Sequence, residues 1–274
     1  MTEPYEYLAE DLGDGDVTSN ALIGAVEARA NMIAREGCVL AGNEEATRIF
    51  EHEGLRVRHF VPDGQAVRPE TVIMEITGDA KAILRTERLA LNFIMQMSGI
   101  ATLTRSLVDK CQAINPNVKI AATRKTTPGF RKYEKNAVEF GGGIRHREGL
   151  YDQILIKDNH LKFTESITEA VTKAKQSGLS KLIEVEVVDL AGAEAAAQAG
   201  ADIIMLDNMV PDEGRKASKA IKAINPAIEV EVSGGITPDN ITEYADFADR
   251  ISLGWLTHSA KACDFSIEII ETLE

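Results

Sequence analysis

Hydrophobic and polar positions alternate regularly over the C-terminal part of the chain. From about residue 118, short β-branched runs are followed by amphipathic stretches, a pattern typical of a βα repeat. It predicts strands at 119–122, 154–156, 182–187, 203–206, 228–232 and 250–253, and helices at 162–176, 190–199, 213–223 and 238–245. The last four strands begin 21 to 25 residues apart, which is room for one strand, one helix and two loops. Because roughly 145 residues are too few for the eight units of a standard barrel, we expect six or seven strands, closed or nearly closed.

The N-terminal part has a different pattern and predicts a separate α+β domain. Short strands are expected at 38–40, 55–60 and 71–76. A long helix follows at about 80–111, with Ser98-Gly99 as a candidate interruption, because glycine weakens a helix interior by about 1 kcal/mol relative to alanine. The predicted domains are therefore 1–110 and 111–274, and it is left open whether the last residues pack back onto the first domain.

Composition and charge narrow the class of protein. The 274 residues are 44% apolar and 27% charged, as in ordinary globular proteins, and the net charge of -13 argues against unspecific binding to nucleic acid or to an anionic membrane. The three cysteines lie far apart, which favours neither a disulfide framework nor a zinc site. Neither a signal peptide nor a membrane-spanning run is recognisable, so a cytoplasmic location is expected.

One segment reverses the charge of the chain. Between residues 119 and 147 eight basic residues face two acidic ones. Arg131, Lys132 and Lys135 are best explained as a solvated helix face. Arg124 and Lys125 instead follow a predicted strand, and the carboxyl ends of barrel strands are where active sites form.

Further basic residues occupy similar positions. His146 and Arg147 follow three consecutive glycines, and Lys157 ends the strand at 154–156. A flexible loop and a surface lysine are the alternative explanations. Together with Arg124 and Lys125, these side chains would form a small cationic pocket that suits a dianion or dicarboxylate.

Arg88 is a separate candidate on the long N-terminal helix. Its neighbours three and four positions away are Leu84, Arg85, Leu91 and Asn92, so no carboxylate is available for an intrahelical ion pair. Either the guanidinium reaches solvent, or it completes a site across a domain or subunit boundary.

The later strands carry carboxylates and are followed by small-residue turns. Period-two alternation places Glu184 with Glu186, and Glu229 with Glu231, on one face of their strands, and Asp207 ends another strand. A half-exposed edge strand is the alternative, whereas a functional role would suit hydroxyl groups and Mg²⁺. The turns at 233–235 and 254–259 fit a phosphate site, since barrel phosphate sites use the last loops. A phosphorylated sugar is therefore a candidate ligand.

These motifs, taken in order, resemble the quinolinate phosphoribosyltransferase family. The matching segments are 10–18, 87–92, 123–129, 141–147, 157–160, 184–186, 206–208, 233–235 and 253–259. The resemblance implies an α/β fold with an N-terminal α/β sandwich domain and an incomplete, about seven-stranded α/β barrel, as in type II phosphoribosyltransferases. It also implies Mg²⁺ as cofactor, and quinolinate and phosphoribosyl pyrophosphate as substrates that yield nicotinate mononucleotide, pyrophosphate and carbon dioxide. A homodimer or an assembly of dimers is expected.

The resemblance also implies roles for single residues. Lys125, Glu186 and Asp207 would be catalytic, and Glu186 and Asp207 would share Mg²⁺ with the substrate phosphates. Arg88 would reach the neighbouring subunit's site. The full set of expected substrate-binding residues is Arg88, Thr123, Arg124, Lys125, His146, Arg147, Lys157, Glu186, Asp207, Ser233, Gly234, Gly235, Gly254, Trp255 and Leu256. Trp255 departs from the family pattern, in which a smaller side chain is expected.

Two other functions are compatible with parts of this pattern. A phosphate-binding barrel aldolase or isomerase could use Lys125 or Lys157 as a Schiff-base nucleophile. A non-catalytic relative associated with molybdenum transport shares the fold and the Arg-Lys-Thr and His-Arg motifs. The segment 157–160 favours the transferase.

Overall fold

The computed structural model describes residues 3–273, which form two compact units. Unit 1 comprises residues 1–105, 127–142 and 260–274, and unit 2 comprises 106–126 and 143–259. Both units are discontinuous in sequence, whereas the expected domains were single stretches. The expected boundary between residues 110 and 111 stays a prediction.

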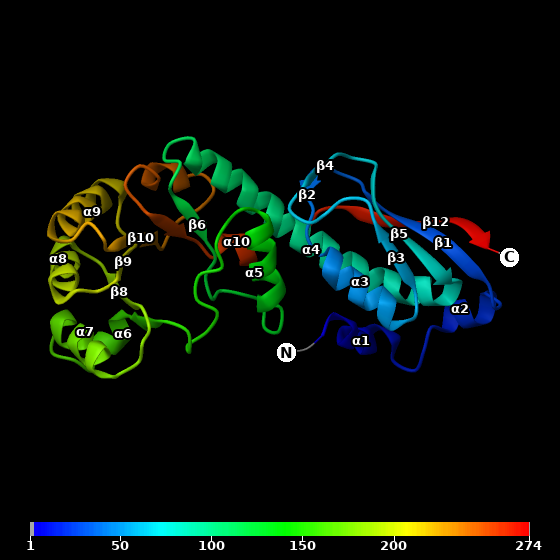
Figure 1. Ribbon diagram of the computed structural model, residues 1–274, viewed down its shortest axis with the longest axis horizontal. Helices are drawn as coiled ribbons and strands as arrows, with labels where there is room; N and C mark the ends of the chain where they lie inside the picture. Colours follow the sequence, from blue (N-terminus) through cyan, green and yellow to red (C-terminus); the bar gives the residue numbers. More distant parts are fainter. Residues whose placement is uncertain (1–2, 274) are drawn as a thin grey trace. The chain divides into compact units, whose positions relative to one another are not determined.

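Unit 1 is built on an antiparallel sheet of four strands in the order β12-β1-β5-β3 (Figure 1). Its strands are β1 (Glu27–Ala34), β3 (Arg56–His59), β5 (Thr71–Asp79) and β12 (Phe265–Leu273), and β2 (Cys38–Val39) pairs separately with β4 (Ala66–Val67). On β1 the alternate residues Ala28, Ala30 and Met32 are buried, which gives the sheet its apolar face. The strands expected at 38–40, 55–60 and 71–76 are present, whereas β1, β4 and β12 were not predicted.

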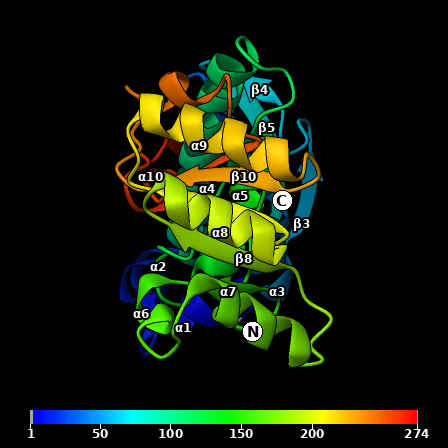
Figure 2. The ribbon, with the colours of Figure 1, turned by 90° about the vertical axis from the view of Figure 1, so that its left-hand side faces the viewer.

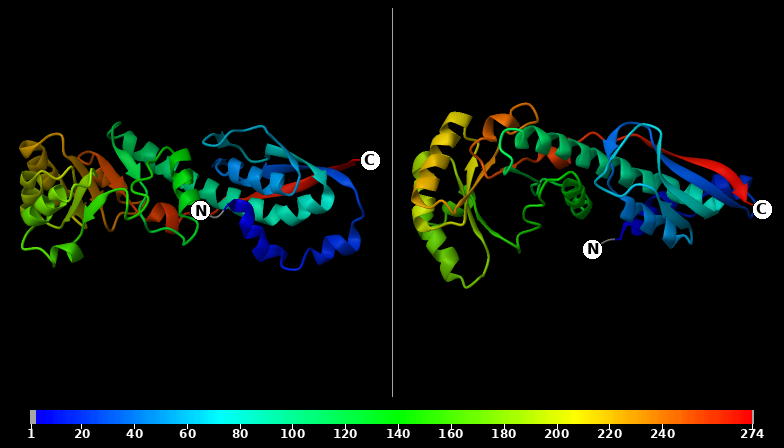
Figure 3. Two further views of the ribbon diagram at one scale, coloured as in Figure 1. Left: turned by 60° about the horizontal axis from the view of Figure 1, so that its bottom comes forward. Right: turned by 45° about the horizontal axis from the view of Figure 1, so that its top comes forward.

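The helices of unit 1 include one that carries the candidate Arg88. The helical elements are η1 (Pro4–Tyr7), α1 (Leu8–Leu12), α2 (Val17–Leu22), α3 (Asn43–His52), α4 (Ala80–Gln112) and α5 (Arg131–Phe140), with the end of α4 lying in unit 2. Helix α4 is unbroken (Figure 3), so the suggested interruption at Ser98-Gly99 is wrong. Gly99 serves a close approach instead: a Cβ there would lie within 3 Å of the carbonyl group of Lys261, and only glycine leaves room.

Unit 2 is a parallel sheet of six strands in the order β6-β11-β10-β9-β8-β7. The strands are β6 (Lys119–Ala121), β7 (Ile154–Ile156), β8 (Ile183–Val187), β9 (Ile203–Asp207), β10 (Glu229–Ser233) and β11 (Arg250–Ser252). All six predicted strands are therefore confirmed. Six or seven strands were expected, and the sheet has six. Beyond β6 the pairing continues only as a single parallel bridge between Ala121 and Ile144.

Helices follow the strands of unit 2, as a βα repeat requires. They are α6 (Asp158–Leu161), α7 (Ile167–Gln176), α8 (Leu190–Ala199), α9 (Pro211–Ile224), η2 (Ile241–Tyr244) and α10 (Trp255–His258). Figure 2 shows α8 and α9 side by side across β8 and β10.

Two of the predicted helices in unit 2 are shorter than expected. The helix predicted at 162–176 begins only at Ile167, because the hydroxyl of Ser166 caps it by accepting the main-chain N–H of Glu169. The helix predicted at 238–245 is wrong, since only a short 3₁₀ turn forms there. The side chain of Asn240 accepts the main-chain N–H of Thr237, and this local bond favours a turn over a helix.

Candidate functional site

A pocket of about 550 Å³ lies at the carboxyl ends of the unit 2 strands. The expected residues come to it from the ends of different strands, as the topology requires. The pocket is lined by Ala122, Thr123, Arg124, Lys125, His146, Arg147, Leu155, Lys157, Glu186, Met205, Asp207, Asn208, Glu231, Ser233, Gly234, Gly235 and Ser252. Eleven of the fifteen expected substrate-binding residues are among them.

The cationic side of the pocket contains two arginines. Nε of Arg124 is buried and has no hydrogen-bond partner within residues 3–273. Arg147 is 8% exposed, and burial lowers the pKa of its guanidinium, with the charge of Arg124 lowering it further. Two guanidinium groups that repel each other in a partly buried pocket favour an anionic ligand.

The acidic side contributes carboxylates from two neighbouring strands. Nζ of Lys157 donates a hydrogen bond to Glu186, which is largely buried on β8. Asp207 ends β9, and one of its oxygens accepts a 2.7 Å hydrogen bond from the side-chain amide of Asn208. The edge-strand explanation for the glutamates is wrong, because β8 and β10 each lie between two other strands.

The turn after β10 has no room for a side chain at Gly234. Gly234 has φ +81°, and a Cβ there would lie 2.6 Å from the amide group of Asn208 and 2.7 Å from Oδ1 of Asp207. Gly235 has φ +64°. The turn therefore places main-chain atoms close to Asp207, which fits a site that approaches a ligand with its backbone.

A largely buried polar cluster of His146, Glu184, Glu231 and Arg250 adjoins the pocket, and His146 and Glu231 also line it. Glu231 accepts hydrogen bonds from Nε of Arg250 and from the hydroxyl of Ser252, and Nε2 of His146 lies 3.0 Å from its Oε2. Nη2 of Arg250 lies 3.4 Å from Oε2 of Glu184. Burial, followed by the charge of Glu231, raises the pKa of Glu184 to about 8, so this carboxyl group is largely protonated at neutral pH.

Two sets of residues in unit 2 offer ligands for a metal ion. His146, Glu184 and Glu231 place one ligand atom each within 4.8 Å of one another. This cluster does not fit Mg²⁺, because both oxygens of Glu231 already accept hydrogen bonds, from Arg250 and Ser252, and the Arg250 guanidinium also lies 3.4 Å from Glu184. The expected pair Glu186 and Asp207 lines the open pocket and fits better, since Mg²⁺ takes one or two carboxylates and completes its shell with water or phosphate oxygens.

Four of the expected substrate-binding residues do not line this pocket. Gly254, Trp255 and Leu256 follow β11, but they are not among the described residues that line the pocket. Leu256 is fully buried, whereas Trp255 is 38% exposed. Lys135, taken as part of a solvated helix face, is fully buried in unit 1, so that interpretation is wrong for this residue.

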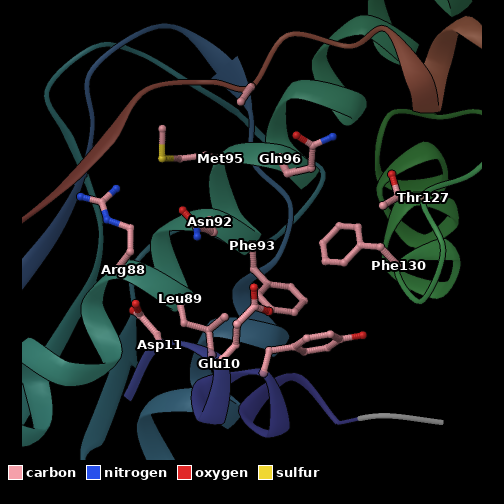
Figure 4. Close-up of a pocket in the computed structure, with 12 residues that line it drawn as sticks. Glu10, Asp11, Arg88, Leu89, Asn92, Phe93, Met95, Gln96, Thr127 and Phe130 are labelled. Atoms are coloured by element: carbon pink, nitrogen blue, oxygen red, sulfur yellow. The ribbon is translucent and has the colours of Figure 1, made fainter. Parts of the chain in front are cut away.

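The fourth of these residues, Arg88, lies in unit 1 and lines a different pocket of about 690 Å³ (Figure 4). It projects from α4, is exposed, and forms no ion pair within the described part of the chain. The same pocket contains Glu10 and Asp11, and the rings of Phe93 and Phe130, whose centroids are 5.1 Å apart.

Comparison with known proteins identifies the family. The model of the quinolinate phosphoribosyl transferase C-terminal domain matches residues 100–268, and that of the N-terminal domain matches residues 16–98. The chain belongs to this family. Together with the expected motifs, the match covers nearly the whole sequence and selects the transferase over the aldolase and the transport-associated relative.

Relatives of this family member are similar over most of their length. The probable nicotinate-nucleotide pyrophosphorylase (carboxylating) of Archaeoglobus fulgidus is 42% identical over 260 residues, covering 94% of this chain and 99% of the relative. The human nicotinate-nucleotide pyrophosphorylase (carboxylating) is 38% identical over 248 residues, covering 90% and 84%. The solved structure of the nicotinate-nucleotide pyrophosphorylase from Francisella tularensis superposes with a TM-score of 0.91 at 38% identity, covering 97% and 94%.

These matches confirm the expected fold class, with an antiparallel N-terminal domain and a parallel, barrel-like C-terminal domain. Sequence reasoning considered Glu231 only as one of several carboxylates suited to hydroxyl groups and Mg²⁺, and it did not assign a role to Arg250, Ser252 or Asn208. A charged residue at the start of a predicted strand, as Arg250 is in β11, was the available signal, because such a charge requires a partner when the strand is buried.

Proposed function

We propose that this chain transfers the phosphoribosyl group of phosphoribosyl pyrophosphate to quinolinate and releases pyrophosphate and carbon dioxide. The product is nicotinate mononucleotide, a precursor in NAD biosynthesis. The observation that carries the proposal is the unit 2 pocket, in which a buried and a half-buried guanidinium group, two carboxylates from neighbouring strands and a glycine turn come together. The family and the names of the full-length relatives support it.

Quinolinate is a small aromatic dianion, and the cationic side of the pocket suits it. Arg124 has a buried, unpartnered Nε, and Arg147 lies near enough for its pKa to be lowered by the charge of Arg124. Guanidinium groups bind carboxylates with two parallel hydrogen bonds, so these two residues would hold the two carboxylates. Thr123 and Lys157 complete this part of the pocket.

The phosphoribosyl group would occupy the part of the pocket that lies against β9 and β10. There the turn of Ser233, Gly234 and Gly235 would donate main-chain N–H groups to the 5′-phosphate. Gly254, Trp255 and Leu256 remain proposed contributors through their main chain. Lys125 is exposed at the pocket and would bind the pyrophosphate.

Glu186 and Asp207 would act on the ribose and would hold Mg²⁺. Mg²⁺, when bound, neutralises phosphate charge and so assists departure of the pyrophosphate. The two carboxylates would stabilise the positive charge that develops at the anomeric carbon, a role that requires fixed position rather than proton transfer. Lys157 supplies such fixation for Glu186 through their hydrogen bond.

Arg88 would act in the pocket of a partner subunit, so we propose a homodimer or an assembly of dimers. Its guanidinium is exposed and forms no ion pair in the described chain, and the unit 1 pocket around it contains an aromatic cluster. A two-fold interface presents the same surface twice, so each chain would complete the other's site.

A complementation experiment tests this role of Arg88. Subunits with Arg88→Ala and subunits with Lys125→Ala should each be inactive alone. After verified subunit exchange, half of the dimers are mixed and half of their sites are intact, so roughly a quarter of wild-type activity should return. No recovery would refute the action of Arg88 across the interface.

The assay for the activity itself is direct. Incubation with quinolinate, phosphoribosyl pyrophosphate and Mg²⁺ should form nicotinate mononucleotide, and omission of any one of the three should prevent it. Absence of product from a folded protein in the complete mixture would refute the proposed function.

We also propose a cytoplasmic location. All three cysteines are free and buried, which is typical of a reducing compartment. Across residues 3–273, none of the helices combines the length and apolar character needed to cross a bilayer.

A further inference from the structure

Both ring nitrogens of His146 are occupied by the protein itself. The main-chain N–H of Arg147 donates a 2.7 Å hydrogen bond to Nδ1, and Nε2 lies 3.0 Å from Oε2 of Glu231. An N–H group can only donate and a carboxylate can only accept, so Nδ1 carries no proton and Nε2–H donates to Glu231. In this arrangement neither nitrogen is left to donate to a substrate carboxylate.

Glu231 is held in the orientation that this requires. It is fully buried, its Oε1 accepts from Ser252 at 2.5 Å, and Nε of Arg250 donates to its Oε2. Three donors converge on its two oxygens, one of them the guanidinium of Arg250, and such contacts favour the ionised carboxylate despite its burial. Glu231 is therefore an acceptor that anchors the imidazole.

The backbone at His146 needs such an anchor. Its φ of +55° lies in the left-handed region, which costs a residue other than glycine about 1 kcal/mol or more. Strained conformations persist where neighbouring contacts stabilise them. Here Nδ1 of the ring accepts a hydrogen bond from the main-chain N–H of the next residue, Arg147, and so stabilises the turn. The residue presented by this turn is Arg147, which is 8% exposed and lines the pocket.

We infer that His146 is a positioning residue, which Glu231 anchors and which holds Arg147 in place to bind a substrate carboxylate. Arg147 supplies the charge for binding, whereas the imidazole supplies an acceptor for its main chain. Glu231 and Ser252 border the pocket, but in this scheme they and Arg250 act through His146 and not by binding substrate. The inference rests on the proposed function, since it names how that same pocket fixes its carboxylate-binding guanidinium.

Two substitutions at one position separate positioning from direct binding. The side-chain oxygen of Asn is attached to Cγ, as Nδ1 is, so His146→Asn keeps an acceptor for the N–H of Arg147. Asn also tolerates the left-handed backbone. The amide of Gln lies one atom further out, so His146→Gln keeps a donor towards Glu231 but loses the acceptor for Arg147. Thermal melting and the affinity for phosphoribosyl pyrophosphate serve as controls for folding and for the rest of the site.

The expected result is a difference between the two variants in quinolinate affinity. Titration calorimetry should show quinolinate bound at least about tenfold more weakly by His146→Gln than by His146→Asn, since a hydrogen bond to a charged group is at stake. The KM for quinolinate should differ likewise, with similar kcat values at saturation. Equal losses, or a greater loss in His146→Asn, would overturn the inference and favour direct binding by the ring.

A double-mutant comparison tests the anchor. Glu231→Gln in the wild type should weaken quinolinate binding about tenfold. In the His146→Asn background the same substitution should weaken binding by less than a further factor of about two, because the hydrogen bond between residue 146 and Glu231 is already lost there. Equal effects in both backgrounds would overturn the role of Glu231. If Glu231→Gln does not fold, the pair of His146 variants decides alone. Failure of the wild type to bind quinolinate at all would instead refute the proposed function.

Discussion

The turn at Gly234 offers a sharp test of the arrangement around Asp207. In Gly234→Ala the new Cβ would lie 2.6 Å from Asn208 and 2.7 Å from Oδ1 of Asp207, whereas ordinary contacts of a Cβ begin at 3.4 Å. Either the turn or these side chains must therefore move by about 0.8 Å. The left-handed backbone at φ +81° adds about 1–2 kcal/mol of strain for any residue with a Cβ.

Gly235→Ala is the matched control. Its φ of +64° imposes the same kind of backbone strain, but the nearest atom to a Cβ there is Oδ1 of Asn208, at 3.8 Å. Both variants should lower the free energy of unfolding by about 1–2 kcal/mol in urea titrations. The effects of the two on catalysis should differ, because only Gly234→Ala displaces Asp207.

A displacement approaching 1 Å at a catalytic carboxylate can cost about a hundredfold in rate. We therefore expect kcat of Gly234→Ala to fall between tenfold and a hundredfold below that of Gly235→Ala, measured as nicotinate mononucleotide formed at saturating substrates. Quinolinate affinity should differ little between the two. Equal kcat values in two folded variants would refute the view that this turn fixes Asp207 for catalysis.

Three further predictions follow from the charges of the pocket. Nicotinate has one carboxylate fewer than quinolinate, so its kcat/KM should be at least about tenfold lower, and equal turnover would contradict a dicarboxylate site. Glu186→Ala and Asp207→Ala should abolish most activity but leave quinolinate affinity nearly intact, as calorimetry can check. Because the pKa of Glu184 is raised from 4.5 to about 8, the folded state holds a proton on this carboxyl group that the unfolded chain has lost. The contribution of Glu184 to the free energy of unfolding therefore falls as the pH rises from 4.5 to about 8. Glu184→Gln should therefore gain stability relative to wild type from pH 5 to 8, by up to about 1.4 kcal/mol per pH unit, and a constant difference in urea titrations would contradict a protonated Glu184.

The sequence predicted the location of the site because parallel strands end at the same edge. Arg124, Lys157 and Asp207 lie far apart in the chain, yet each follows or ends an apolar run. A βα repeat brings such positions together whatever the details of packing. The pocket of unit 2 contains all three.

Contacts between segments that are far apart in the sequence could not be predicted from the order of strands and helices. Strand β12 pairs with β1 across more than 200 residues, and its sequence carries no sign of this partner. The sequence predicts Lys135 to be a surface residue of an amphipathic helix, but it is buried in unit 1. Glu231 and Arg250 are opposite each other in the register of β10 and β11, which becomes visible only when the order of strands is known.

The buried cluster explains how acidic strands can support a cationic pocket. Four ionisable side chains lie together there, but Arg250 neutralises Glu231, Glu184 is largely protonated at neutral pH, and the hydrogen bonds of His146 require its neutral form. The cluster thus carries almost no net charge. It can fix the imidazole and the backbone beside it without cancelling the positive charges that line the pocket, and those charges remain available to a dianion. A chain with a net charge of -13 can in this way keep a local site for an anionic substrate.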